Sequence, residues 1–330
     1  MPAAPEFWQR RGPAAAFLFP LARLYRRVTW LRRLAYERGW FKVERIDVPV
    51  VVVGNIAVGG SGKTPVVLWL VERLRQAGRN PGVVSRGYGG RVRRPTGVTR
   101  QSKPRKVGDE PVLIAARTGV PVWVGPDRVA VARALRKAHP EVDVIVSDDG
   151  MQHYRLGRDC EIAVVDEAQL ANRLPLPSGP MREPLRRLAE CQLVLAHGEL
   201  TPHVHAACPP APVYKMQLVP TAFYDLADPR RRRSAGEFAG KRVVALAGIG
   251  RPQRFFDTLE GLGLKLADRR AFPDHHAFRR GDLAFAKGAT LLVTEKDAVK
   301  LRAFAPADTW VLPVEADIRE GAFERVMERL

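Results

Sequence analysis

Between positions 13 and 40 the apolar residues recur at intervals of three and four, which is the spacing of an amphipathic helix. The apolar positions are Phe17, Leu18, Leu21, Leu24, Tyr25, Val28, Leu31, Leu34 and Ala35. The other face is rich in arginine, and Trp30, Tyr36 and Trp40 supply rings of the kind found at a bilayer boundary. Two interpretations stay open: the helix lies on a membrane surface, or it packs on its own domain and turns its arginines to solvent.

Beyond position 49 the pattern changes to short, continuous apolar runs that end in glycine or acidic residues. The runs cover residues 50–53, 82–84, 120–124, 142–146, 162–165 and 193–196. Continuous runs of this length are typical of strands that are buried on both faces of a parallel sheet. Helical stretches at 65–77 and 128–138 separate some of them. We therefore predict a three-layer α/β/α domain over residues 49–212, with the helical region 1–48 attached to it as part of the same domain.

A proline-rich stretch at 206–212 interrupts the apolar segments and predicts a hinge or linker. After it we expect an extended segment at 214–226, strands at 242–246, 290–294 and 310–314, and a helix around 255–262. These elements predict a second, smaller α/β domain over residues 213–330.

The charge balance narrows the choice of partner. The 330 residues contain 54 Lys+Arg against 35 Asp+Glu, a formal net charge of +19, so the natural partners are nucleic acid, phosphorylated small molecules or an acidic membrane surface. Nucleic acid is disfavoured because aromatic residues are not interleaved with the basic ones as base-stacking surfaces require. The three cysteines form no CxxC pair, which argues against a disulfide framework and a thiolate zinc site. No apolar run is long enough to span a bilayer, so we expect the protein to stay on the cytosolic side.

The strongest local signal is VVVGNIAVGGSGKTP at 51–65, an apolar strand followed by a glycine-rich loop and a helix. This order is typical of the P-loop, whose backbone amides surround phosphate oxygens. The predicted nucleotide-binding positions are Gly59, Gly60, Ser61, Gly62, Lys63 and Thr64. Lys63 supplies a cation for the β- and γ-phosphates, and the Thr64 hydroxyl is a ligand for Mg²⁺. Ala57 departs from the usual pattern, which has glycine at that position.

A second apolar strand, at 142–146, leads into Asp148 and Asp149. A P-loop needs an acidic residue of this kind for its metal, so both aspartates are candidate Mg²⁺ ligands. His153 either lies in the same cleft or is a loop histidine that bonds to the backbone. Arg86 follows a strand at the edge where open α/β sheets bind ligands, and Arg182 lies in a proline-rich loop; both are candidates for contact with an anionic substrate.

Two further clusters offer groups that could activate an acceptor hydroxyl. One contains Asp109 and Glu110, and the other is FPDHH at 272–276, with His275 and His276. Each could equally be an ordinary turn, and local sequence does not bring them together. The segment TEKD at 294–297 superficially resembles a guanine-reading signature, so nucleotide preference needs measurement.

Several of these motifs recur together in one protein family. They are GNIAVGGSGKTP (54–65), SRGYG (85–89), GDEP (108–111), DDGMQH (148–153), LPSGPMREP (176–184), GIGRP (248–252), FPDHH (272–276) and TEKDAVK (294–300). In order and spacing, over nearly the whole chain, the sequence resembles the tetraacyldisaccharide 4'-kinases of lipid A biosynthesis. Ala57 is a habit of that family, whereas Met151 stands where the family usually has phenylalanine.

The resemblance implies a P-loop NTPase-like N-terminal domain and a smaller domain that closes over the active-site cleft. It implies transfer of the ATP γ-phosphate, with Mg²⁺, to the 4'-hydroxyl of a tetraacyldisaccharide 1-phosphate at the cytoplasmic face of the inner membrane, with no obligate protein partner. By the family pattern, Asp109 and His275 are the acceptor-activating pair, Asp148 and Asp149 the metal or catalytic acids. Second-rank substrate residues are Arg86, His153, Arg182 and His276. The alternative is a soluble P-loop kinase or ATPase that acts on a phosphorylated metabolite.

Overall fold

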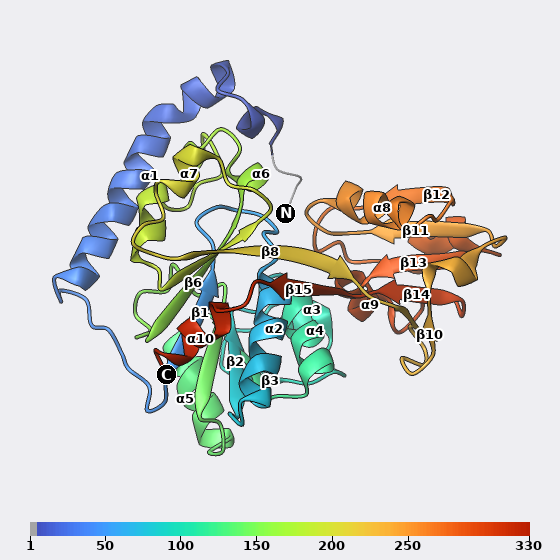
Figure 1. Ribbon diagram of the computed structural model, residues 1–330, viewed down its shortest axis with the longest axis horizontal. Helices are drawn as coiled ribbons and strands as arrows, with labels where there is room; N and C mark the ends of the chain where they lie inside the picture. Colours follow the sequence, from blue (N-terminus) through green and yellow to red (C-terminus); the bar gives the residue numbers. More distant parts are fainter. Residues whose placement is uncertain (1–4) are drawn as a thin grey trace.

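The computed structural model describes residues 5–330, which form a larger and a smaller α/β part side by side (Figure 1). The described residues of the larger part build a nine-stranded sheet. Its spatial order is β15 (Val314–Ile318), β8 (Val213–Pro220), β7 (Leu193–His197), β6 (Cys160–Asp166), β1 (Val50–Gly54), β5 (Val144–Asp148), β2 (Pro81–Ser85), β4 (Val122–Val124) and β3 (Thr96–Val98). Neighbouring strands from β8 to β4 run parallel, and only the two edge strands are antiparallel. The predicted parallel sheet is confirmed.

Helices cover both faces of this sheet. They are α2 (Lys63–Gln76), α3 (Pro104–Val107), α4 (Asp109–Thr118), α5 (Arg128–Ala138), α6 (Glu167–Leu170), α7 (Pro202–His205) and α10 (Ala322–Met327). Alternate residues of β1 enter different cores, because successive strand side chains point to opposite faces. Val51 and Val53 pack in the core that contains α2 and α4, whereas Val50 and Val52 pack in the one that contains α5. This arrangement is the predicted three-layer sandwich.

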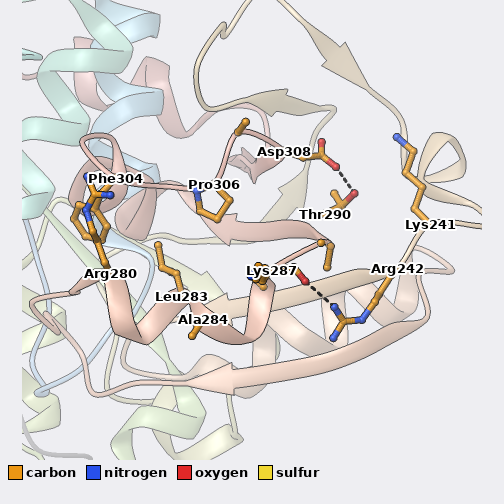
Figure 2. A pocket seen from close by; sticks show the side chains of 14 residues that line it. Lys241, Arg242, Arg280, Leu283, Ala284, Lys287, Thr290, Phe304, Pro306 and Asp308 are labelled. Atoms are coloured by element: carbon orange, nitrogen blue, oxygen red, sulfur yellow. Dashed lines mark hydrogen bonds between the residues drawn. The ribbon is translucent and has the colours of Figure 1, made fainter.

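The smaller part contains a six-stranded sheet. Its order is β10 (Arg232–Arg233), β9 (Phe223–Asp225), β14 (Thr309–Leu312), β13 (Thr290–Thr294), β11 (Val243–Ala247) and β12 (Leu266–Ala271), with helices α8 (Pro252–Gly261) and α9 (Glu295–Leu301). Short 3-10 helices occur at Glu6–Gln9, Leu185–Glu190, Ala235–Phe238 and Arg280–Ala286. A cavity of about 750 Å³ opens at the amino-terminal ends of β11 and β13, with Arg242 and Thr290 on its wall (Figure 2). The loops that face the larger part leave the opposite, carboxyl-terminal ends of the same strands.

The boundary predicted at 212/213 does not coincide with the division between the sheets. Strand β8 starts at Val213 but pairs with β7 in the larger sheet, and β15 returns from the smaller part to pair with β8. The chain end therefore lies on the larger part (Figure 1). The strand expected at 310–314 is two strands, because Pro313 has no N–H for a ladder hydrogen bond and separates β14 from β15. Which sheet an edge strand joins depends on residues distant in sequence. The local apolar pattern therefore could not predict that β8 and β15 belong to the larger sheet.

The predicted N-terminal helix is present as α1 (Pro13–Glu37), and it lies along one flank of the larger part (Figure 1). Its fully buried positions are the small residues Ala15, Ala22 and Ala35, and Leu18, Tyr25 and Leu34 are half-buried. A row of large apolar side chains points away from the protein. We call this row, Phe17, Leu21, Leu24, Val28 and Leu31, the exposed stripe; its residues are 52–85% exposed. No helix among residues 5–330 is long and apolar enough to cross a membrane.

Candidate active site

The glycine-rich loop connects β1 to α2 and ends at Lys63, the first residue of the helix. Helix α2 begins two residues before the predicted start at 65, because Gly62 caps it with a φ of +91° that disfavours residues with a side chain. Lys63 Nζ lies 3.5 Å from the Gly59 carbonyl oxygen and 3.6 Å from Asp149 Oδ1. The loop thus directs a cation and the free amides of a helix N-terminus at one point, which is the arrangement that binds phosphate.

The two departures from familiar patterns have simple structural explanations. Ala57 is 2% exposed and pairs with Met181 in an isolated bridge, and its φ is not positive, so the backbone there does not require glycine. Met151 is fully buried in the apolar core beside β1, where a flexible thioether can fill the space of another apolar side chain.

Asp148 and Asp149 follow β5, directly beside the glycine loop, but their surroundings differ. Asp148 is buried and accepts a hydrogen bond from Ser85 Oγ at 3.1 Å. Burial and the neighbouring charges of Glu110 and Asp149 raise the pKa of Asp148 to about 7. Burial acts in the same sense on Asp149, but the Lys63 and Arg182 charges outweigh it and lower the pKa of Asp149 to about 2. Among the described residues, Asp149 thus forms ion pairs with Lys63 and Arg182, whereas Asp148 forms none.

Arg182 is held against this acidic pair. Its Nη1 donates to both Oδ1 and Oδ2 of Asp149 at 3.1 Å and to Gln152 Oε1 at 3.3 Å. The same segment connects to α1, because Tyr25 Oη donates to the Arg182 carbonyl oxygen at 3.4 Å. Arg32 of α1 donates to the Gln152 carbonyl oxygen at 3.3 Å. The helix that carries the exposed stripe is thus connected to the acidic edge of the glycine loop.

The structure brings together the two clusters that the sequence left apart. Asp109 is the first residue of α4, and His275 lies in the loop after β12. His275 Nδ1 is 3.0 Å from both carboxylate oxygens of Asp109, across 166 positions of sequence. Burial alone raises the pKa of Asp109, but the hydrogen bond from His275 and two nearby lysine charges outweigh it and lower the pKa to about 2. Gly108 is required before Asp109, because an added Cβ would lie 2.7 Å from the Tyr88 carbonyl oxygen.

His276 forms its side-chain hydrogen bond with Asp282 and not with Asp109. Its Nε2 lies 3.0 Å from Asp282 Oδ2, and its ring packs between Phe272 and Phe278. This geometry distinguishes the two histidines, which composition alone could not. A cavity of about 540 Å³ opens beside the pair. Its wall includes Asp109, His275, His276, Lys300 and the basic residues Arg91, Lys103, Arg105 and Lys106.

His153 and Arg86 lie on loops at the same edge of the sheet. His153 Nε2 accepts a hydrogen bond from the Arg128 backbone N–H at 3.3 Å, as a loop histidine bonded to backbone does. Burial and the charge of Arg128 lower the pKa of His153 to about 4, so the ring is neutral at pH 7. Arg86 is exposed in the turn after β2.

Sequence reasoning missed Arg128, a buried arginine beside the two aspartates. It is 4% exposed, and burial lowers its pKa to about 10 although the charges of Asp148 and Asp149 oppose the change. Its Nη1 donates to the Gly125 carbonyl oxygen at 3.1 Å, and its Nε has no hydrogen-bond partner among the described residues. The only signal in the sequence was its place at the carboxyl end of a short strand, just after the N-cap Asp127.

Both charged side chains of the TEKD lysine–aspartate pair have partners within the fold. Asp297 is completely buried and accepts hydrogen bonds from the Gly248 backbone N–H at 2.9 Å and from Thr294 Oγ1 at 2.7 Å. Lys296 Nζ lies 3.0 Å from Glu110 Oε1 and 3.3 Å from Asp274 Oδ1. The lysine–aspartate pair therefore makes contacts within the protein.

Comparison with known proteins places this site in a family. Residues 14–330 match the family described as Tetraacyldisaccharide-1-P 4'-kinase. The tetraacyldisaccharide 4'-kinase of Azoarcus sp. (strain BH72) is 55% identical over 333 residues, covering 100% of this chain and 96% of the relative. That of Aromatoleum aromaticum is 52% identical over 327 residues, covering 99% and 97%. A solved structure of LpxK from Aquifex aeolicus, described as an "apo" form in complex with ATP, shares 25% identity and a TM-score of 0.80, covering 95% of this chain and 98% of that one. The chain belongs to the tetraacyldisaccharide-1-P 4'-kinase family.

Proposed function

We propose that this protein transfers the γ-phosphate of ATP to the 4'-hydroxyl of a tetraacyldisaccharide 1-phosphate. The observation that carries the proposal is the proximity of the glycine loop to the loop that holds His275. A Cβ placed on Gly250 would lie 3.9 Å from the Gly60 backbone nitrogen and 3.7 Å from Asp274 Oδ2. A phosphate held by the loop and an acceptor held by the Asp109–His275 pair would therefore meet in one cleft.

The glycine loop is the site for the triphosphate. The amides of Gly59 to Thr64 and the ammonium of Lys63 would hold the β- and γ-phosphates. Arg182 already neutralises Asp149, so Asp148 is the better candidate for a metal ligand. A buried carboxylate among other acids is stabilised by a divalent cation, and the Thr64 hydroxyl would be a second oxygen ligand, so these residues fit Mg²⁺. When bound, Mg²⁺ supplies positive charge to the phosphate oxygens.

The Asp109–His275 pair would act on the acceptor. Its position suits removal of the 4'-hydroxyl proton as that oxygen bonds to the γ-phosphorus, while the bond from phosphorus to the bridging β–γ oxygen breaks and ADP leaves. The candidates to neutralise the transferred phosphoryl group or the anionic acceptor are Arg86, Arg128 and Arg182. His153 holds the Arg128 backbone by accepting a hydrogen bond from its N–H. His276 is a neighbouring candidate on the cavity wall. Closure of the smaller part over the cleft would exclude water from the reaction.

The exposed stripe would place the enzyme on the membrane that contains its acceptor. Burial in lipid would remove these apolar side chains from water, and the arginines of α1 would contact anionic headgroups. The exposed stripe and these arginines support a peripheral or monotopic attachment, which we place in this proposal at the cytoplasmic face of the inner membrane.

Transfer of labelled γ-phosphate to the acceptor in mixed micelles tests the proposal. Wild type and the matched variant Lys137→Ala, an exposed lysine at the end of α5, should transfer phosphate. Lys63→Ala or excess EDTA should lower transfer by at least about 100-fold. Transfer only to soluble phosphorylated metabolites, and none to the acylated acceptor, would reject the lipid substrate.

A further inference from the structure

The TEKDAVK segment carries two half-buried lysines, Lys296 and Lys300, that the reaction described above does not use. The Lys300 side chain is 8% exposed and lies on α9 of the smaller part. Its Nζ donates to the Gly248 carbonyl oxygen at 3.2 Å and forms an ion pair, without hydrogen-bond alignment, with Asp297 Oδ1 at 2.7 Å. The same Nζ lies 3.8 Å from Asp109 Oδ2 in the larger part.

Lys296 makes a parallel set of contacts one helical turn earlier. It joins Glu110, the residue after Asp109, to Asp274, the residue before His275. The basic groups around Asp109 are thus His275, Lys296 and Lys300. The acidic groups paired with these lysines are Glu110, Asp274 and Asp297. Residues four apart lie on one face of a helix, so α9 directs both lysines at the pair.

We propose that α9 is a clamp for the Asp109–His275 pair and that Lys300 is a positioning residue, which keeps Asp109 charged and aligned with His275. The inference rests on the proposed function of that pair. Because Asp109 belongs to the larger part and Lys300 to the smaller, the clamp is complete only when the two parts are in contact. An ammonium at this distance from a buried carboxylate favours its ionised form and opposes its rotation away from His275.

Two variants separate the charge of Lys300 from its packing. Lys300→Gln keeps a donor for the Gly248 carbonyl but loses the charge, whereas Lys300→Arg keeps the charge. Lys265→Met is the control: Lys265 is exposed and precedes β12, at the far end of the strand from the His275 loop. Thermal unfolding and ATP binding establish that each variant is folded.

For Lys300→Gln we expect kcat to fall at least about 10-fold while the KM for ATP changes less than about threefold. The acid limb of its kcat–pH profile should move to higher pH, because a carboxylate without its cation is harder to ionise. Lys300→Arg should retain most of kcat and the wild-type limb. Added to Asp109→Asn, Lys300→Gln should cause little further loss.

Equal kcat losses and an unmoved acid limb in the Gln and Arg variants would overturn the clamp and leave the lipid kinase assignment intact. NMR of the His275 ring protons, assigned with His275→Asn, gives a readout that needs no acceptor. Lys300→Gln should shift these signals, and Lys300→Arg and Lys265→Met should not. If the wild type transfers no phosphate, the proposed function fails, and the ring signals still test the contact; unshifted signals in Lys300→Gln would overturn it.

Discussion

Removal of apolar side chains from the exposed stripe should detach the protein from membranes without unfolding it. Leu24 and Leu31 are 56% and 52% exposed and make no part of the core, so Leu24→Ser and Leu31→Ser should leave the unfolding midpoint unchanged. Replacement of an exposed leucine by serine removes about 80 Å² of apolar surface, worth about 2 kcal/mol on transfer to lipid at roughly 25 cal/mol per Å². Each substitution should therefore weaken membrane partitioning roughly 30-fold, and the pair several hundred-fold if the effects add.

Flotation with vesicles that contain anionic lipid measures the partition constant directly. Leu262→Ser is the matched control, because Leu262 is an exposed leucine at the end of α8 in the smaller part. Wild type and control should float equally, and the two stripe variants should remain in the dense fraction. If Leu24→Ser and Leu31→Ser float like the wild type, the stripe does not contact lipid and the reasoning from its exposure is wrong.

Three further predictions concern the titratable groups Asp109 and His153 and the charged group Arg187. Asp109→Asn should lower kcat at least about 100-fold with little change in the KM for ATP, because it removes a transition-state role; equal loss of ATP binding would make Asp109 a nucleotide ligand instead. His153 has a pKa of about 4 in the fold, so between about pH 6.5 and 4.5 the unfolded chain takes up a proton that the folded chain does not. Lowering the pH from about 7.5 to 4.5 should thus destabilise wild type by about 2 kcal/mol more than His153→Gln in urea unfolding; identical losses would contradict this. Arg187 is buried in ion pairs with Glu161 and Glu183, so Arg187→Met should cost about 3 kcal/mol or more in the same assay, because it leaves Glu183 without an ion pair among the described residues and Glu161 with Arg158 alone. A loss below about 1 kcal/mol would refute the role of Arg187 in this network.

Much of the larger part could be predicted because most of its strands are continuous apolar runs in the sequence. The first run, at 50–53, lies within β1, and its neighbours were placed nearly as well. The smaller part was harder, since β12 contains Asp268, Arg269 and Arg270 and lies at a sheet edge. A polar edge strand needs only its backbone partners, so its side chains give no apolar signal.

The residues of the candidate site also fall into two groups, those that local sequence patterns predicted and those that depend on contacts between distant segments. The glycine loop and the two aspartates after β5 are local patterns that physical chemistry alone interprets. The Asp109–His275 contact joins distant segments, and only the family resemblance suggested it in advance. Lys300 was invisible for the same reason, because its partner Asp109 is reached only when α9 and α4 pack together.

The exposed stripe illustrates a third limit. Periodicity predicted the helix but not the surface that its apolar face contacts. An apolar helix face is buried equally well against the protein core or against lipid, so both interpretations stayed open. The structure shows that Ala15, Ala22 and Ala35 allow close approach to the protein, whereas the large apolar side chains of the exposed stripe are left outside.

The central claim is that this cleft transfers the γ-phosphate of ATP to a sugar hydroxyl. The position of the new phosphate in the product tests it most directly. Two-dimensional ¹H–³¹P NMR of the product formed by wild type from ATP and a tetraacyldisaccharide 1-phosphate identifies the proton that couples to the added phosphorus. The account predicts a monoester coupled to the proton at the 4' carbon, absent with Lys63→Ala. A pyrophosphate at the existing 1-phosphate, or release of inorganic phosphate alone, would contradict it.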